Sequence, residues 1–125
     1  MIDVQTLLTG LRDRFPACES VAFADLSAGM ILATSTARDL PQERWDDLCD
    51  TAVAMMRGDV AGLTGAIYPD GPGFAILRDK DEIGIFVRSA TAPDDSLCCV
   101  CRPQVEVLAL IAAARDSLAR IEAGG

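Results

Sequence analysis

The sequence predicts an α+β domain built on one five-stranded antiparallel sheet with helices on both faces. Apolar residues recur at helical spacing in three segments, one near each end and one in the middle. The segments between them read as short strands joined by tight turns, which only antiparallel pairing permits. The 125-residue chain is 50% hydrophobic, enough to bury one core without metals or disulfides. We therefore expect a single domain over residues 1–125, in the order α-β-β-α-β-β-β-α.

The first helix is expected over residues 3–15, with Asp3 capping it by accepting a hydrogen bond from a free backbone N–H. Its apolar face is formed by Val4, Leu7, Leu8, Leu11 and Phe15. A strand pair at 21–26 and 30–34 follows. Gly29 supplies the positive φ angle that the connecting turn needs.

The second helix is expected to begin near Pro41 and to end at Gly58, a common residue just after a helix. Its apolar stripe contains Trp45, Leu48, Cys49, Ala52, Val53 and Met56, with Met55 beside it. Its opposite face is acidic, with Asp46, Asp47 and Asp50. Residues 59–72 are glycine-rich and are expected to form a loop with a possible short strand near Ala66.

Three strands are expected at 74–77, 83–87 and 96–102, with a tight turn at Lys80 and Asp81 between the first two. Pro103 is expected to open a last helix that runs to about residue 122. The residues of this helix expected in the core are Val107, Leu108, Ile111, Ala112, Leu118 and Ile121.

The bulk composition disfavours several classes of function. The formal net charge is −8, and an acidic surface repels nucleic acids and anionic lipids while suiting a partner with a basic patch. The chain has no histidine, the commonest general base and metal ligand. No secretory signal or membrane-spanning run is recognisable, so a cytoplasmic protein without cofactor is expected.

The cysteines are the most conspicuous chemical cluster. On a strand, Cys99 and Cys101 point to one face and Cys98 to the other. A zinc site usually needs a second ligand pair, which only Cys18 and Cys49 could supply, and only if the fold brought them close. Reduced cysteine is often a buried apolar residue, so core packing is favoured over metal or redox chemistry.

The expected layers leave part of the sheet uncovered. If the first and last helices cover the same face, the middle helix covers the other face alone and is too narrow for five strands. Part of that face would remain apolar and open, as partner-binding surfaces do.

The chain resembles the roadblock/LC7 family. The resemblance is carried by Leu7 to Phe15, by VAFADLSAGMILATS, by the acidic second helix ending in Gly58, and by DEIGIFVRSATAPDDSLCCVCRP. It implies a homodimer that pairs second helices and third strands, and a regulator or scaffold of Ras-like small GTPases rather than an enzyme. The implied interface residues are Trp45, Leu48, Ala52, Met55, Met56, Phe74 and Ile76.

Two alternative functions remain open. One is a small-ligand sensor of profilin-like or PAS-like build, in which Cys99, Cys101 and Trp45 could line a cavity beside the sheet. The other is a thiol or metal protein that uses Cys98, Cys99 and Cys101. No nucleophile–base pair is recognisable in the sequence, so catalysis has the weakest support.

Overall fold

The structure, a computed structural model, describes residues 3–57, 73–92 and 94–124. Its elements are α1 (Val4–Arg14), β1 (Cys18–Asp25), β2 (Met30–Thr36), α2 (Gln42–Arg57), β3 (Phe74–Asp79), β4 (Glu82–Arg88), β5 (Asp95–Cys101) and α4 (Val107–Gly124). The loop and strand predicted between 59 and 72, and the helix end predicted at Gly58, lie outside the described residues.

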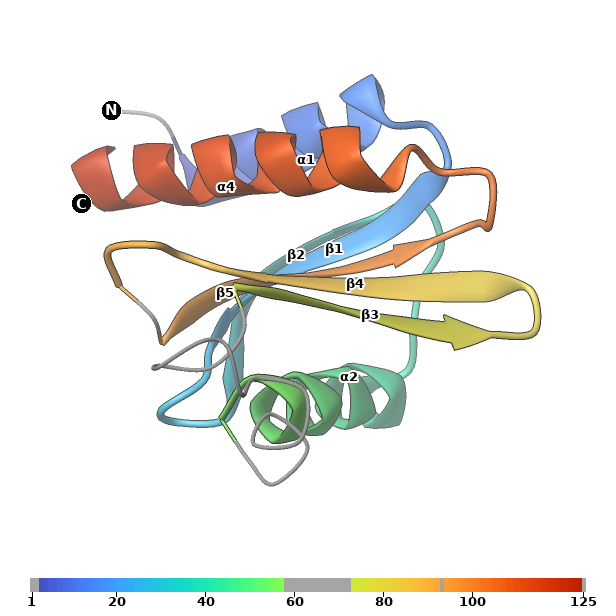
Figure 1. Ribbon diagram of the computed structural model, residues 1–125, viewed down its shortest axis with the longest axis horizontal. Helices are drawn as coiled ribbons and strands as arrows, with labels where there is room; N and C mark the ends of the chain where they lie inside the picture. The colour runs from blue at the N-terminus through green and yellow to red at the C-terminus, as the bar shows by residue number, and fades with distance from the viewer. Residues whose placement is uncertain (1–2, 58–72, 93, 125) are drawn as a thin grey trace.

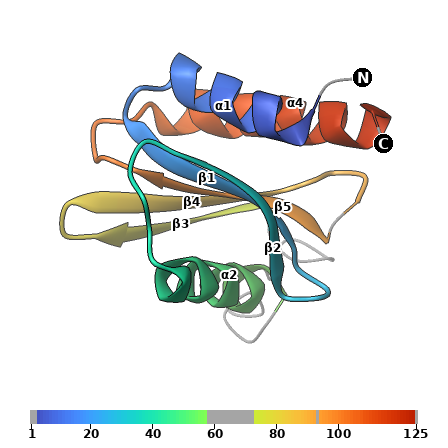
Figure 2. The same cartoon turned by 180° about the vertical axis from the view of Figure 1, so that it is seen from behind.

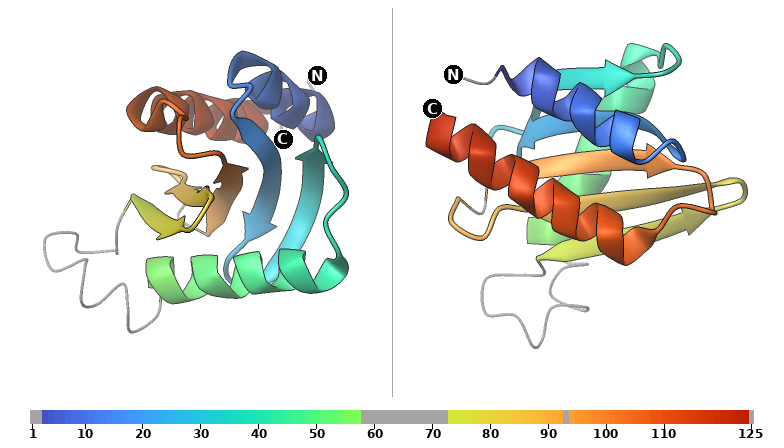
Figure 3. Two further views of the ribbon diagram at one scale, coloured as in Figure 1. Left: turned by 90° about the vertical axis from the view of Figure 1, so that its right-hand side faces the viewer. Right: turned by 90° about the horizontal axis from the view of Figure 1, so that it is seen from above.

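The elements form three layers, which confirms the predicted α+β fold (Figures 1 and 2). The strands lie in the order β2-β1-β5-β4-β3, and every neighbouring pair is antiparallel. Helices α1 and α4 lie side by side on one face, and α2 lies on the other (Figure 3). Because β5 is the central strand, its cysteines are interior, as predicted.

Strand alternation divides the apolar residues between two cores. Val21, Phe23 and Cys99 belong to the core beneath α1 and α4. Ala22 and Cys98 belong to the second core, which α2 covers. Neighbouring residues along β1 and β5 thus serve opposite faces of the sheet, as the period of two requires.

The turn between β1 and β2 has the predicted chemistry. Gly29 has φ 64°, a left-handed conformation that costs glycine little. A carboxylate oxygen of Asp25 accepts hydrogen bonds from the backbone N–H groups of Ser27 at 2.9 Å and Ala28 at 3.3 Å. These bonds fix the turn that returns the chain as the outer strand β2.

The last helix begins four residues later than predicted. Residues 103–105 form a turn in which the Val105 N–H donates to the Arg102 carbonyl at 3.1 Å. The Glu106 carbonyl then accepts the Leu110 N–H at 2.9 Å, which starts the helix. The turn brings Val105 into the core, so Pro103 serves the corner between β5 and α4 rather than the first helical turn.

The buried face of α4 differs from the predicted one at two positions, whereas Ile111 and Leu118 are buried as predicted. Leu108 is 79% exposed and Ala112 is exposed. Leu110, Ala113 and Ala114 are buried in their place, at spacings of three and four residues. Several faces of this alanine-rich helix are apolar, so the sequence pattern alone did not select the one that packs against the sheet.

The start of α1 differs in one detail. Asp3 occupies the N-cap position, but its side chain makes no capping hydrogen bond. Its backbone carbonyl accepts the Leu7 N–H at 3.1 Å instead. The helix is held mainly by burial of Leu8 and Leu11 beneath it. Within the described residues, no helix has the length and apolarity needed to cross a membrane.

Candidate protein-interaction surface

Strand β3 is exposed on both faces. Ile76 lies on the α1/α4 face and is 42% exposed, while Leu77 lies on the α2 face and is 47% exposed. Four consecutive residues, 76–79, are exposed, whereas most residues of the neighbouring strand β4 are buried. The strand therefore presents large apolar side chains that the described part of the protomer leaves uncovered.

Within the described residues, no strand pairs with the outer edge of β3. The Arg88 N–H donates to the Gly73 carbonyl at 2.9 Å, which marks a hydrogen-bonded pair at the start of the β3–β4 ladder. Because such pairs alternate along an antiparallel ladder, Phe74, Ile76 and Arg78 direct their N–H and C=O groups away from β4. The ladder has no register shift, so the free edge is regular.

The opposite edge of the sheet, β2, is less suited to pairing. Its register with β1 shifts after Phe23, which leaves Leu32 as a bulge residue. The Gln5 side chain donates from Nε2 to the Thr34 carbonyl at 2.6 Å, and α1 packs against the strand. A bulge and a covered carbonyl both disfavour the addition of another strand.

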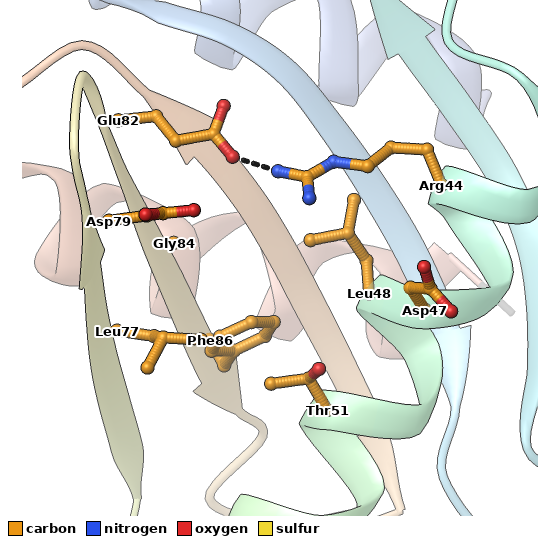
Figure 4. A pocket seen from close by; sticks show the side chains of 9 residues that line it. All are labelled: Arg44, Asp47, Leu48, Thr51, Leu77, Asp79, Glu82, Gly84 and Phe86. Carbon is orange, nitrogen blue, oxygen red and sulfur yellow. Dashed lines mark hydrogen bonds and ion pairs between the residues drawn. The ribbon is translucent and has the colours of Figure 1, made fainter.

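A groove lies beside β3, between α2 and the β3–β4 hairpin (Figure 4). Its volume is about 70 Å³, far below the roughly 300–1,000 Å³ typical of small-ligand pockets. Its lining residues are Arg44, Asp47, Leu48, Thr51, Leu77, Asp79, Glu82, Gly84 and Phe86. A Cβ on Gly84 would lie 3.3 Å from the Phe86 ring, so this glycine leaves room for the ring beneath Leu77.

The upper end of the groove is polar. Arg44 of α2 forms an ion pair with Glu82 of β4, which joins the helix to the hairpin (Figure 4). Arg38 lies 3.9 Å from the same carboxylate. The groove thus combines an apolar floor with a charged end, as protein interfaces commonly do.

The predicted interface residues do not form one exposed patch. Ile76 is exposed, and Met55 and Phe74 are half-buried. Four others are buried against the chain's own sheet: Trp45, Leu48, Ala52 and Met56. Their contact with a second chain stays a prediction, because these four already serve the protomer's own core.

Sequence reasoning missed Thr51 and Gly84, which border the groove, and it included Leu77 only as the end of the strand expected to carry dimerisation. The available signal was the run of two large apolar residues, Ile76 and Leu77, in one strand. One residue of such a pair faces each side of the sheet, so both sides must be covered if both are to be buried.

The cysteines pack in two groups on opposite faces. All five are reduced and buried. Burial raises the pKa of the Cys98 thiol to about 12, which keeps it protonated. No set of three or more histidine, cysteine, aspartate or glutamate side chains in the described ranges could hold a metal ion. Cys99 and Cys101 face α4 whereas Trp45 faces the opposite core, so the cavity suggested for a sensor does not form from them.

No family model and no curated protein matches this chain. Solved structures do match. A roadblock/LC7 domain from Streptomyces avermitilis has a TM-score of 0.76 at 14% identity, covering 97% of this chain and 96% of that one. MglB from Myxococcus xanthus has a TM-score of 0.73 at 13% identity, covering 98% and 96%. The gliding protein MglB from Thermus thermophilus has 0.73 at 16%, covering 98% and 90%. The chain therefore has a roadblock/LC7-like fold.

The structure predicts opposite outcomes for two glutamate substitutions. Trp45→Glu removes a buried ring, which costs about 3–5 kcal/mol, and adds a buried charge, so cooperative unfolding should be lost or strongly shifted. Leu77→Glu alters an exposed position and should change protomer stability by about 0.5 kcal/mol or less. Urea unfolding at high dilution measures both. Equal losses of unfolding stability in the two variants would contradict the burial of Trp45 and the exposure of Leu77.

Proposed function

We propose that this chain is a non-enzymatic interaction module that forms a homodimer through β3, and that the dimer serves as a regulator or scaffold of a Ras-like small GTPase. The observation that carries the proposal is the regular edge of β3, which no other described strand pairs with, beside an open groove. The roadblock/LC7-like fold and the sequence resemblance supply the GTPase connection.

A second copy suits this edge because a twofold axis perpendicular to the sheet places corresponding faces of the two sheets on the same side. Residues opposite each other in an antiparallel pair share a face, so Ile76 and Leu77 would meet apolar residues of the partner on their own sides. The two sheets would join into one. This arrangement covers both exposed faces of β3 with a single contact.

The free backbone groups favour a register centred on Ile76. In that register Ile76 faces its own copy, Phe74 faces Arg78 of the other copy, and Ala75 faces Leu77. Every outward N–H and C=O group of Phe74, Ile76 and Arg78 then has a partner. A register centred on Arg78 would place like charges opposite each other, which is destabilising.

The position of the groove also favours a second copy of this chain as the partner. With the axis perpendicular to the sheet, α2 of both copies lies on the same side of the joined sheet. The groove between α2 and the β3–β4 hairpin then faces the junction, where the second copy covers the exposed Leu77 side chain above the already buried Phe86 ring. Exclusion of water from this apolar floor would stabilise the dimer.

The acidic outer face of α2 supports a partner with a basic surface. Asp46, Asp47 and Asp50 are all exposed, and the whole chain carries a formal charge of −8. Such a field accelerates association with a positively charged protein and weakens as salt is added. A face of this sign would repel phosphate backbones, which is consistent with a protein partner.

Self-association is predicted to depend on β3 and not on β2. Ile76→Glu and Leu77→Glu should each weaken the dimer by roughly 30-fold or more, because each places an unpaired charge in the contact. Met30→Glu and Leu32→Glu are matched controls, since these β2 residues are 54% and 53% exposed. Sedimentation equilibrium over a concentration series measures the dissociation constant.

A wild-type chain that stays monomeric at tens of micromolar would refute the homodimer. If only the β2 variants weakened the dimer, the contact would lie at the β2 edge and the assignment to β3 would be wrong.

Binding to a small GTPase is predicted to be salt-dependent and to require the α2 face. The test protein is a Ras-like small GTPase from the same organism, loaded with GDP or with a non-hydrolysable GTP analogue. Calorimetry should give binding to one nucleotide form, weakened by added salt and by Asp46→Asn, Asp47→Asn and Asp50→Asn together. The control neutralises three exposed acids near the opposite face: Asp13, Glu106 and Asp116.

Equal weakening by the two triple variants would show only a general charge effect. No binding of either nucleotide form would remove the GTPase role while leaving the dimer untouched.

A further inference from the structure

Two cysteines from different strands lie directly opposite each other in the core beneath α1 and α4. Cys18 begins β1 and Cys101 ends β5, and they are register partners in the antiparallel ladder. Both belong to the same buried cluster, so their side chains point to the same face. The two residues are 83 positions apart in sequence, and only the sheet register brings them together.

The backbone geometry at this point suits a disulfide. The Arg102 N–H donates to the Ala17 carbonyl at 2.8 Å, which makes the flanking pair hydrogen-bonded. The next pair, Cys18 with Cys101, is therefore non-hydrogen-bonded, the kind of pair whose Cα atoms lie about 4.5 Å apart in a regular ladder. That separation lies at the short end of the range spanned by disulfides, about 4.4–6.8 Å. The register between the two strands shifts just beyond this pair.

A third thiol completes the cluster. The neighbouring Cys101 and Cys99 thiols lower the pKa of Cys18 despite its burial. The Cys18 thiol itself donates a hydrogen bond to the Ser20 carbonyl at 3.6 Å. The same contacts raise the pKa of Cys101 and of Cys99. Cys18 is thus the sulfur of the three most readily present as thiolate, the reactive form of cysteine.

A surface cavity lies near the end of the sheet that holds this pair, and neither cysteine lines it. The cavity, of about 240 Å³, opens where β1 begins and β5 ends, and Ala17 and Val105 line it. Ala17 immediately precedes Cys18, and Val105 follows Cys101 by four residues. The cavity therefore lies at the same end of the sheet as the two sulfurs.

We propose that Cys18 and Cys101 form a reversible redox site that closes to a disulfide in the presence of a peroxide. The Cys18 thiolate attacks one peroxide oxygen, the O–O bond breaks, and a sulfenic acid and water form. The Cys101 sulfur then attacks the Cys18 sulfur and expels a second water. Overall the two thiols lose two protons and two electrons, and hydrogen peroxide is reduced to two waters.

The disulfide would tie together two corners of the fold. Cys18 follows the turn after α1, and Cys101 precedes the turn into α4. The bond would therefore fix both helices of one layer to the central strand pair and constrain the unfolded chain. The site is independent of the proposed dimer, because β1 and β5 are interior strands whereas β3 is an edge.

The test treats the folded chain with hydrogen peroxide, blocks the remaining thiols under denaturing conditions, and maps the peptides without reduction. The expected product is a Cys18–Cys101 link, with a loss of two hydrogens in the intact mass and a higher urea midpoint. Dithiothreitol should reverse all of these changes. Cys98→Ser is the matched control, because Cys98 lies in the same strand but in the opposite core. It should leave the link intact.

Cys101→Ser should abolish the link and leave Cys18 as the residue trapped by a sulfenic-acid reagent. Oxidation of Cys18 in the wild type without a link to Cys101 would overturn the proposal. A link from Cys18 to Cys99 in the wild type would overturn it as well, as would protection of all five thiols from peroxide until the chain unfolds.

Discussion

The structure depends on one constraint, that a five-stranded sheet has two apolar faces and both must be buried. Among the described elements, helices α1 and α4 together cover one face, whereas α2 alone covers the other. Burying an apolar side chain such as leucine contributes roughly 1.5–3 kcal/mol, so uncovered positions are costly. Within the described protomer the deficit falls on β3, where Ile76 and Leu77 are exposed on opposite faces. A partner that extends the sheet removes the deficit on both faces at once.

The same alternation separates the chemistry of the two cores. Along β5, Cys98 faces α2 while Cys99 and Cys101 face α1 and α4. Cys98 shares its core with Cys49. Cys101 lies opposite Cys18 across the ladder, whereas Cys99 lies opposite Val21. One strand thus packs against both cores, and in the proposed redox site it supplies a reactive sulfur on one face, while the β3 edge remains available for a partner.

The sequence predicted what depends on local pattern. Helical and strand periods gave the element order, and the short SAG loop gave the turn at Gly29. It misplaced Pro103 and Leu108, because the corner before α4 and the rotation of that helix depend on tertiary packing. The Trp45 stripe was recognised as apolar, but a stripe does not reveal whether its own sheet or a partner covers it. The Cys18–Cys101 pair required the register of two strands distant in sequence.

The most direct test of the central claim is amide hydrogen exchange, resolved by residue, at several protein concentrations. The outward amides of Phe74, Ile76 and Arg78 should exchange rapidly in dilute protein and become protected as the concentration rises. Protection of the β2 amides should not change with concentration. Fast exchange at all three β3 amides at every concentration would contradict pairing through this edge.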